Sequence, residues 1–226
     1  MGDDLCVGGV VPLTTIDYPG CLSAVVFLQG CSWRCRYCHN PHLQCMAASE
    51  VFAWEDVLSL LRLRRGFVEA VVFSGGEPLL QTGLPEAVAD VAALGFRLGL
   101  HTAGAFPDRL EAIVSLLHWV GFDLKYAFDN YQFITGVEDS GEMARASLKV
   151  LLKSNTDFEV RMTLHESMEA AVIIEALEEA AALGVKNVAL QKCRDKDENI
   201  VEHPIFSDKL MLGRMSRCFD SFQVRG

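Results

Sequence analysis

Short apolar segments alternate with longer amphipathic segments along most of the chain, and this pattern predicts the secondary structure. The apolar segments are rich in β-branched and aromatic residues, as is typical of strands that are buried on both faces. The predicted strands span residues 22–28, 69–73, 96–100, 119–124, 157–164 and 186–191. Between them apolar residues recur at helical spacing, and the predicted helices span residues 50–64, 84–94, 107–117, 141–153 and 168–183.

Two nearly identical segments mark joints between a helix and a strand. Residues 92–96 read Ala-Ala-Leu-Gly-Phe and residues 181–185 read Ala-Ala-Leu-Gly-Val, and each glycine suits the left-handed residue that ends a helix. Strands that alternate with helices in this way form a parallel sheet covered by helices, so the pattern predicts an α/β fold. Beyond residue 193 we expect a charged loop, a helix near 206–217 and a final strand, SFQVR.

Polar and glycine-rich residues lie at the carboxyl end of each of the six predicted strands. Because the carboxyl ends of parallel strands meet at one edge of a sheet or one mouth of a barrel, we expect these residues to form a single site. In chain order they are the cysteine segment 31–38, Ser74–Pro78, His101–Gly104, Asp123 with Lys125, Arg161–His165 and Gln191–Lys192.

Side chains alternate in character along the fifth predicted strand. Apolar residues from Phe158 to Leu164 share one face, whereas Glu159, Arg161 and Thr163 share the other. If the apolar face meets the helices, the polar face lines a common interior. Charges in an interior are costly unless they are paired or hold a ligand. Arg161 is therefore expected to contact a ligand or to pair with Glu159 or Glu77.

Length and composition are those of one ordinary globular domain. The chain has 226 residues, half of them apolar, and no Gly/Ser-rich linker divides it, so we expect a single domain over residues 1–226. No apolar run approaches the ~18 residues of a membrane span, and the N-terminus lacks a signal-peptide pattern, which predicts a cytoplasmic protein with no membrane partner. A net charge of -10 with only short basic clusters argues against a nucleic-acid partner.

The segment GCSWRCRYCHNP, residues 30–41, concentrates three of the eight cysteines, Cys31, Cys35 and Cys38. In a reducing cytosol such thiols are more often metal ligands or catalytic groups than disulfides. A structural zinc site needs a fourth ligand, for which the local candidates are His39, His42 and Cys45. An iron–sulfur cubane takes one thiolate per iron, so three cysteines would leave the fourth iron open for reaction. On this segment alone both metals remain alternatives.

The cysteine segment and two later motifs resemble the radical S-adenosylmethionine (SAM) superfamily. CSWRCRYC, residues 31–38, resembles the superfamily's cluster motif, and Gly75-Gly76-Glu77-Pro78 resembles its glycine-rich motif for the SAM amino group. Asp123-Leu124-Lys125 resembles the DxK motif of glycyl-radical-enzyme activases. The stretch from Gly8 to Pro41 is similar to the branch that activates anaerobic ribonucleotide reductase. The resemblance covers about residues 8–192, which leaves residues 193–226 as a C-terminal extension.

This resemblance implies a partial (β/α)6 barrel that carries one [4Fe-4S] cluster on Cys31, Cys35 and Cys38, with SAM on the open iron. It implies an enzyme that cleaves SAM to a 5′-deoxyadenosyl radical, which removes a hydrogen atom from a glycine of a partner glycyl radical enzyme. For this branch the implied partner is anaerobic ribonucleotide reductase, with a flavodoxin or ferredoxin as electron donor. The remaining cysteines form no second motif, which predicts one cluster. Cys193 follows a strand end and could approach the site, but it is expected to be a buried, inert thiol.

Roles for single residues are implied by their matching positions. Lys125 matches a SAM ligand with Asp123 as its partner, and Arg161 matches a further SAM contact. The other expected cofactor-binding residues are Tyr37, Asn40, Gly75, Gly76, Glu77, Pro78, His101 and Thr102.

The chain departs from the resemblance at His101. Related activases often have an aspartate there, which in a relative helps to bind a monovalent cation beside SAM. A neutral imidazole is a poor substitute for that carboxylate, so the cation site is in question. His101 is expected either to meet the ligand directly or to fill space.

Two other functions stay open at this point. One is a radical SAM enzyme that acts on a small molecule or a nucleoside, and the other is a zinc or iron–sulfur module that regulates without turnover. A large open barrel mouth would favour a protein substrate, whereas a closed polar pocket would favour a small one.

Overall fold

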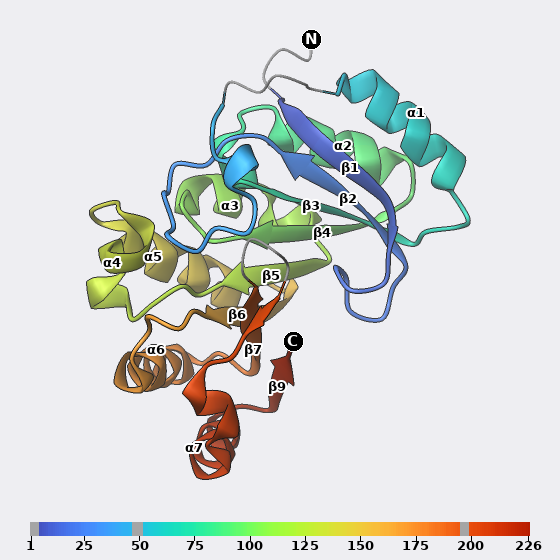
Figure 1. The fold of residues 1–226 in the computed structure, drawn as a ribbon. Coiled ribbons are helices and arrows are strands. Elements are labelled where there is room, and N and C mark those ends of the chain that lie inside the picture. Colours follow the sequence, from blue (N-terminus) through green and yellow to red (C-terminus); the bar gives the residue numbers. More distant parts are fainter. Residues whose placement is uncertain (1–4, 47–51, 195–198) are drawn as a thin grey trace.

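The fold is built on one sheet with helices packed against it (Figure 1). The structure is a computed structural model that describes residues 5–46, 52–194 and 199–226. The strands are β1 (Val7–Thr14), β2 (Ser23–Leu28), β3 (Ala70–Gly75), β4 (Arg97–Thr102), β5 (Trp119–Asp123), β6 (Asp157–Leu164), β7 (Asn187–Arg194), β8 (Ile200–Val201) and β9 (Ser221–Arg225). They follow the order β1 to β8 across the sheet, and β9 pairs with the free side of β7.

The six predicted strands are β2 to β7, with ends that differ from the prediction by up to three residues. All five pairs from β2–β3 to β6–β7 are parallel, which confirms the predicted α/β fold and is consistent with a partial TIM-type barrel. The final strand is β9, which adds a further parallel strand beside β7.

Two strands lie outside the prediction, and both sit at the periphery of the sheet. β1 runs antiparallel to β2 at one edge, and the short β8 runs antiparallel to β7. β1 contains Gly8, Gly9 and Pro12, which are disfavoured in central strands but tolerated at an edge. Its sequence therefore lacks the apolar run by which the other strands were recognised.

The helices are α1 (Trp54–Arg64), α2 (Leu84–Ala93), α3 (Pro107–Ile113), α4 (Gln132–Thr135), α5 (Ser140–Lys153), α6 (Ala170–Leu183) and α7 (Lys209–Met215). The predicted helix 50–64 starts only at Trp54, because Ala53 is extended and Phe52 forms a bridge with Val7, while residues 50 and 51 lie outside the described residues. The predicted helix 107–117 ends in a 3-10 turn at 114–116, and 206–217 is α7 between two such turns. The four-residue helix α4 was not predicted.

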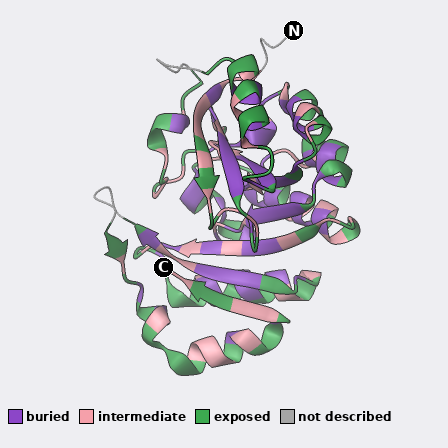
Figure 2. Cartoon of the chain, turned by 90° about the vertical axis from the view of Figure 1, so that its right-hand side faces the viewer, coloured by how far each residue is buried: buried purple, intermediate pink, exposed green. Residues whose placement is uncertain are grey.

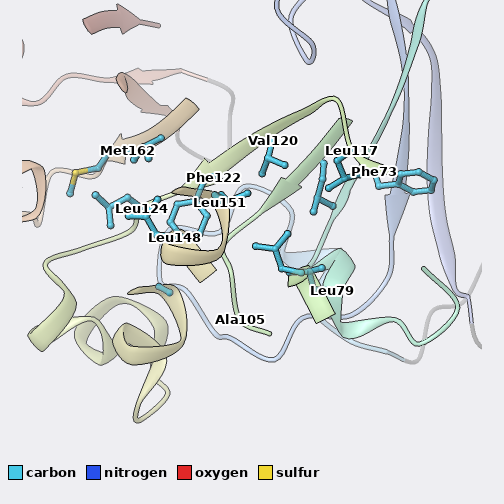
Figure 3. Packing of buried hydrophobic residues seen from close by; sticks show 14 of the residues in the cluster. Phe73, Leu79, Ala105, Leu117, Val120, Phe122, Leu124, Leu148, Leu151 and Met162 are labelled. Carbon is cyan, nitrogen blue, oxygen red and sulfur yellow. The ribbon is translucent and has the colours of Figure 1, made fainter. Parts of the chain in front are cut away.

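The apolar faces of the strands pack against the helices, as the alternation in the sequence predicted. Phe122 of β5 and Leu124, which directly follows this strand, meet Leu148 and Leu151 of α5, and Met162 of β6 lies beside them (Figure 3). The inner strands β2 to β5 are buried along most of their length, whereas the helices keep an exposed outer side (Figure 2). None of the helices in the described part of the chain is long and apolar enough to cross a membrane.

The opposite, inner face of the sheet holds a smaller apolar cluster and, above it, the polar residues. Val25, Ala70, Val72, Trp119 and Tyr18 form the cluster. Continuing along the same face toward the carboxyl ends of the strands, alternation places Ser74, His101, Asp123, Arg161 and Thr163. Apolar side chains therefore fill the barrel interior at the amino ends of the strands, and polar side chains line it at the carboxyl ends.

The C-terminal strand contributes a charge to this interior. Arg225 of β9 donates two hydrogen bonds to the carboxylate of Glu159 in β6, at 2.7 and 2.8 Å. Glu159 is only 7% exposed, so its charge requires a partner. Of the two pairings considered for Arg161, the one with Glu159 is wrong, because Arg225 occupies that carboxylate.

The Arg225–Glu159 pair predicts a measurable contribution to stability. Arg225→Met leaves a buried carboxylate without its charged donor and is expected to lower the free energy of unfolding by about 1–3 kcal/mol in urea titrations. Arg217→Met is the matched control, because Arg217 is exposed and should change stability by less than about 0.5 kcal/mol. Equal losses in the two variants would contradict a specific role for the pair.

Candidate functional site

The cysteine segment leaves β2 as a loop whose two ends are joined by hydrogen bonds. The backbone amides of Gly30 and Cys31 donate to the carbonyls of Leu43 (2.7 Å) and Gln44 (3.1 Å). The buried side chain of Gln29 donates through Nε2 to the carbonyls of His42 and Cys45, at 2.8 and 2.6 Å. The loop is therefore a closed unit with a defined shape.

Aromatic side chains fix the outer part of this loop. Trp33 is 1% exposed and packs edge-on against Tyr131, with 5.7 Å between ring centroids. The amide of Arg34 donates to the carbonyl of Thr135 at 2.8 Å, which ties the loop to α4. Tyr37 stacks on His165 at 5.5 Å. Tyr131 and α4 were missed by the sequence reasoning, because no motif marks them.

Cys31, Cys35 and Cys38 are half-buried, form no disulfide and line one cavity. A single zinc ion would need all its thiolates about 2.3 Å from one point. Among the described residues, no three His, Cys, Asp or Glu side chains are grouped closely enough to hold one ion. A cluster binds each thiolate to a different iron, so its ligands lie farther apart. Three thiolates, one for each of three irons, are a donor set that fits an iron–sulfur cluster.

Burial holds the thiols of Cys31 and Cys35 in the protonated form. It raises the pKa of Cys31 to about 11, and it raises the pKa of Cys35 as well, with the positive charge of Lys125 opposing both shifts. Because metal ligation requires thiolates, loading this site must release protons.

The local candidates for a fourth zinc ligand differ in position: His39 lines the same cavity as the three cysteines, whereas His42 and Cys45 are not part of its lining. The side chain of His42 is exposed, and so is Cys45. His39 is exposed and has its Nε2 3.9 Å from the sulfur of Cys193, at the end of β7. Cys193 itself is 1% exposed, so it is buried as expected but lies against the cysteine loop.

The segment Gly75-Gly76-Glu77-Pro78 runs against the start of the cysteine loop. The amide of Gly76 donates to the carbonyl of Leu28 at 2.9 Å, and the amide of Glu77 donates to the carbonyl of Gly30 at 2.8 Å. A Cβ on Gly75 would lie 2.3 Å from the Leu28 carbonyl oxygen, and one on Gly76 would lie 2.1 Å from that of Gly30. Gly75 also has φ +120°, which disfavours any side chain. The glycines are thus required by a backbone contact.

Glu77 is buried and its carboxylate is fully engaged within the protein. It accepts hydrogen bonds from Thr102 Oγ1 (2.7 Å) and from the amides of Leu79 (3.1 Å) and Ala103 (3.0 Å). Burial raises the pKa of Glu77, although these donors counter the shift. The carboxylate therefore joins the end of β3 to the end of β4. The alternative pairing of Arg161 with Glu77 is wrong.

Arg161 instead pairs with Asp123. Its Nε and Nη2 donate to Asp123 Oδ1 at 3.0 and 2.8 Å, and Lys125 Nζ lies 3.8 Å from Oδ2. Burial alone would raise the pKa of Asp123, but the charges of Arg161 and Lys125 lower it. Burial would likewise lower the pKa of Lys125, but the Asp123 charge raises it. The Asp123 carboxylate is therefore shared by two basic side chains, Arg161 and Lys125.

Both ring nitrogens of His101 have partners. Nε2 lies 2.9 Å from the carbonyl oxygen of Asp17, and Nδ1 lies 3.4 Å from Ser74 Oγ. The ring also meets Trp119 edge-on at 5.6 Å. Burial and the nearby Arg161 lower the pKa of His101 to about 3, so the imidazole is neutral.

A cavity of about 140 Å³ brings most of the expected site residues together. Of these it is lined by Cys31, Cys35, Tyr37, Cys38, Asn40, Gly75, Gly76, His101, Thr102, Asp123 and Lys125. Glu77, Pro78 and Arg161 do not line the cavity. Arg161 is connected to it by its hydrogen bond to the lining residue Asp123. The cavity is also lined by Trp33, His39, Gln44, Ser74, Ala103 and Thr163. Of these, Trp33, Ser74, Ala103 and Thr163 belong to the segments that were expected at the site from the sequence.

A larger groove of about 550 Å³ lies beside this cavity. Arg161 and Trp119 line it, together with Ile16, Asp17 and Pro19 from the β1–β2 connection and Gln191, Lys192, Arg194, Arg225 and Gly226 from β7 and the C-terminal end. It therefore lies where the first and last parts of the sheet face each other. Arg161 belongs to this groove and, through Asp123, to the wall of the smaller cavity.

The Radical SAM superfamily model matches residues 25–169 of the chain, which include the cysteine loop, the glycine-rich segment and Arg161. The chain is 37% identical over 172 residues to a protein of Methanocaldococcus jannaschii that is provisionally named a glycyl-radical enzyme activating enzyme, covering 70% of this chain and 67% of that one. It is 40% identical over 130 residues to the pyruvate formate-lyase-activating enzyme of Clostridium pasteurianum, covering 54% and 53% of the two chains.

Among solved structures, the fold resembles that of SuiB from Streptococcus suis bound to S-adenosylmethionine. The TM-score is 0.68 at 11% identity, and the match covers 88% of this chain and 48% of SuiB. The chain thus spans about two thirds of the archaeal relative, and about half of the clostridial enzyme and of SuiB.

The contact between Gly76 and Gly30 predicts a steric effect on the site. Gly76→Ala places a methyl group where the Gly30 carbonyl lies, so the start of the cysteine loop must shift, at an expected loss of about 1–3 kcal/mol in the free energy of unfolding. Gly213→Ala is the control, since a Cβ there meets nothing within 4 Å and helix propensity favours alanine. An equally stable Gly76→Ala variant would contradict the contact.

Proposed function

The chain belongs to the radical SAM superfamily, and on that premise we propose that it is the activating enzyme of a glycyl radical enzyme. The observation that carries the proposal is the grouping of three cysteines, two glycines and Lys125 around one cavity at the carboxyl ends of the strands. The names of the archaeal and clostridial relatives support the activase assignment over other superfamily reactions.

The family implies an iron–sulfur cluster and SAM, and the donor set of the cysteine loop fits one [4Fe-4S] cluster. We assign Cys31, Cys35 and Cys38 to three of its irons and leave the fourth to the amino and carboxylate groups of SAM. When bound, the cluster and SAM would supply the reductive cleavage that yields a 5′-deoxyadenosyl radical. Trp33 and Tyr37 border the three thiols and would exclude water from this chemistry.

Lys125 is the residue we assign to the SAM carboxylate. Its raised pKa keeps the ammonium charged at neutral pH, and its 3.8 Å separation from Asp123 leaves donors for a second carboxylate. Asp123 is held by Arg161 at 2.8 Å and keeps Lys125 in place. We place Arg161 in the site through this pairing.

The remaining expected residues divide into contacts and supports. Gly75, Gly76, Asn40, Tyr37 and Thr102 line the cavity and are assigned to SAM contact. His101 lines it too, but both of its ring nitrogens are hydrogen-bonded within the protein. Glu77 and Pro78 are assigned to support, since the Glu77 carboxylate already accepts three hydrogen bonds from the protein. The SAM amino group would then meet backbone of this segment more readily than the Glu77 side chain.

The proposed substrate is a glycine within a polypeptide segment of the partner enzyme. The groove of about 550 Å³ next to the site offers room for an extended segment, which favours a protein substrate. Within this class we propose anaerobic ribonucleotide reductase, from the similarity of Gly8–Pro41 to that branch. We further propose a flavodoxin or ferredoxin as electron donor, no nucleic-acid or membrane partner, and a cytoplasmic location.

The function is tested by anaerobic reconstitution with iron and sulfide. We expect about four irons per chain, SAM cleavage to methionine and 5′-deoxyadenosine on reduction, and a glycyl radical by electron paramagnetic resonance once the reductase is added. Cys35→Ala should lose the cluster and the cleavage, whereas Cys218→Ala, at an exposed position, should keep both. Cleavage without a radical in any glycyl radical enzyme would favour a small-molecule substrate. A colourless zinc protein would contradict the proposal.

The assignment of Lys125 gives a separate prediction. Lys125→Gln removes a charge-assisted hydrogen bond worth about 1.5–3 kcal/mol, so the Kd for SAM should rise roughly 10- to 100-fold in calorimetric titrations of the reconstituted protein. Lys149→Gln, on the exposed side of α5, is the control and should leave the Kd unchanged. An unaltered Kd in Lys125→Gln would remove Lys125 from the SAM site.

A further inference from the structure

The connection between β1 and β2, residues 15–22, folds into the open side of the barrel. Tyr18 is 3% exposed and packs on Trp119 at 5.5 Å, with the Arg97 guanidinium 5.3 Å from its ring centroid. Gly99 of β4 makes room for it, because a Cβ at that position would lie 3.1 Å from the Tyr18 ring. The loop is therefore anchored inside the sheet by one aromatic side chain.

The residues on either side of Tyr18 face outward. Ile16 is 86% exposed, Pro19 is exposed, and both line the larger groove together with Asp17. Across the groove lie Lys192, Arg194 and Arg225. The position of this loop therefore sets the width of the groove.

His101 joins this loop to the site. A carbonyl oxygen only accepts hydrogen bonds, so the 2.9 Å contact with Asp17 requires a proton on Nε2 of His101. The neutral ring then accepts at Nδ1 from the hydroxyl of Ser74, which directly precedes Gly75. Among the described residues, the His101–Asp17 contact is the hydrogen bond that joins β4 to loop 15–22.

We propose that His101 is a positioning residue: it latches loop 15–22 against the site end of β4, so that the loop forms one wall of the groove in which the partner's glycine-bearing segment lies. This inference rests on the proposed function for the identity of the segment. It also gives His101 a role other than the two expected from the sequence. At the position where related activases often carry an aspartate, this chain carries a side chain that holds a loop.

Two substitutions of His101 distinguish its hydrogen bond to Asp17 from its contact with Ser74. Glutamine places its amide nitrogen near the position of Nε2, so His101→Gln retains a donor to Asp17. Asparagine reaches only the position of Nδ1, so His101→Asn keeps the Ser74 contact and loses the bond to Asp17. The two variants differ in the latch while both remove the imidazole.

The latch is tested by hydrogen–deuterium exchange on the whole chain, without cofactors or partner. The Cys21 amide, which donates to the Tyr18 carbonyl at 3.2 Å, should exchange roughly fivefold faster in His101→Asn than in wild type, as expected for the loss of about 1 kcal/mol. In His101→Gln it should stay close to wild type. Unchanged exchange in His101→Asn, or equal acceleration in both variants, would overturn the latch.

The groove is tested by kinetics of glycyl radical formation with the whole partner enzyme. The KM for the partner should rise several-fold in His101→Asn and be restored in His101→Gln, a difference that a general loss of stability would not produce. If His101→Asn does not fold, Thr14→Val replaces it, because Thr14 Oγ1 donates to Asp17 at 2.6 Å and lies outside the site. Thr14→Val should raise the same KM while partner-free SAM cleavage stays at the wild-type rate.

Different results would overturn the groove assignment, the proposed function and the contact between His101 and the loop. A partner KM that is unmoved in both His101→Asn and Thr14→Val, despite faster loop exchange, would overturn the groove assignment. Wild-type protein that cleaves no SAM would overturn the proposed function, and the exchange experiment would still decide whether His101 holds the loop.

Discussion

The candidate site depends on one close contact between two backbone segments. Gly75 and Gly76 lie so near Leu28 and Gly30 that any side chain on either glycine would overlap a carbonyl oxygen. Two amide–carbonyl hydrogen bonds fix the register of this contact. Because the cysteine loop begins at Gly30, its position relative to β3 is set here. The Glu77 carboxylate extends the same contact to the end of β4, through Thr102 and the Ala103 amide. A cysteine loop, which has no regular structure of its own, is thereby held at a defined place over the strand ends.

Ion pairs reduce the free-energy cost of burying charged side chains in the polar half of the barrel interior. The buried or half-buried charges there have partners in the chain: Asp123 with Arg161 and Lys125, and Glu159 with Arg225. His101 is neutral, and both of its ring nitrogens have hydrogen-bond partners. The Glu77 carboxylate accepts three hydrogen bonds from the protein. A buried charge without a partner would cost several kcal/mol, so this arrangement is a condition for placing Lys125 beside the cysteine loop. Lys125 Nζ lies 3.8 Å from the Asp123 carboxylate, whereas Arg161 Nη2 lies 2.8 Å from it. Lys125 is therefore the cation best placed to bind the carboxylate of a ligand.

Much of the fold could be predicted from the sequence because β2 to β7 are short apolar runs between amphipathic helices. β1 could not, since its glycines and proline resemble a loop and only its edge position allows them. The gathering of polar residues also followed from topology, as the carboxyl ends of parallel strands must meet. The ion pairs across the barrel interior could not be predicted from the topology. Arg161 could face Glu159, Glu77 or Asp123, and only the register Asp123↔Arg161 between β5 and β6, with Arg225 arriving from β9, decides among them. The role of His101 was hidden for the same reason, because its partner Asp17 lies 84 residues away.

The central claim is that three protein thiolates hold the cluster and that the fourth iron is left for SAM. The most direct measurement is an anaerobic crystal structure of the reconstituted protein with SAM bound. The account predicts three ligands, Cys31, Cys35 and Cys38, and a fourth iron that carries the SAM amino and carboxylate groups, with the carboxylate within hydrogen-bond distance of Lys125 Nζ. A fourth iron ligated by His42, Cys45 or Cys193 in the presence of SAM, or a single zinc ion in the loop, would contradict it.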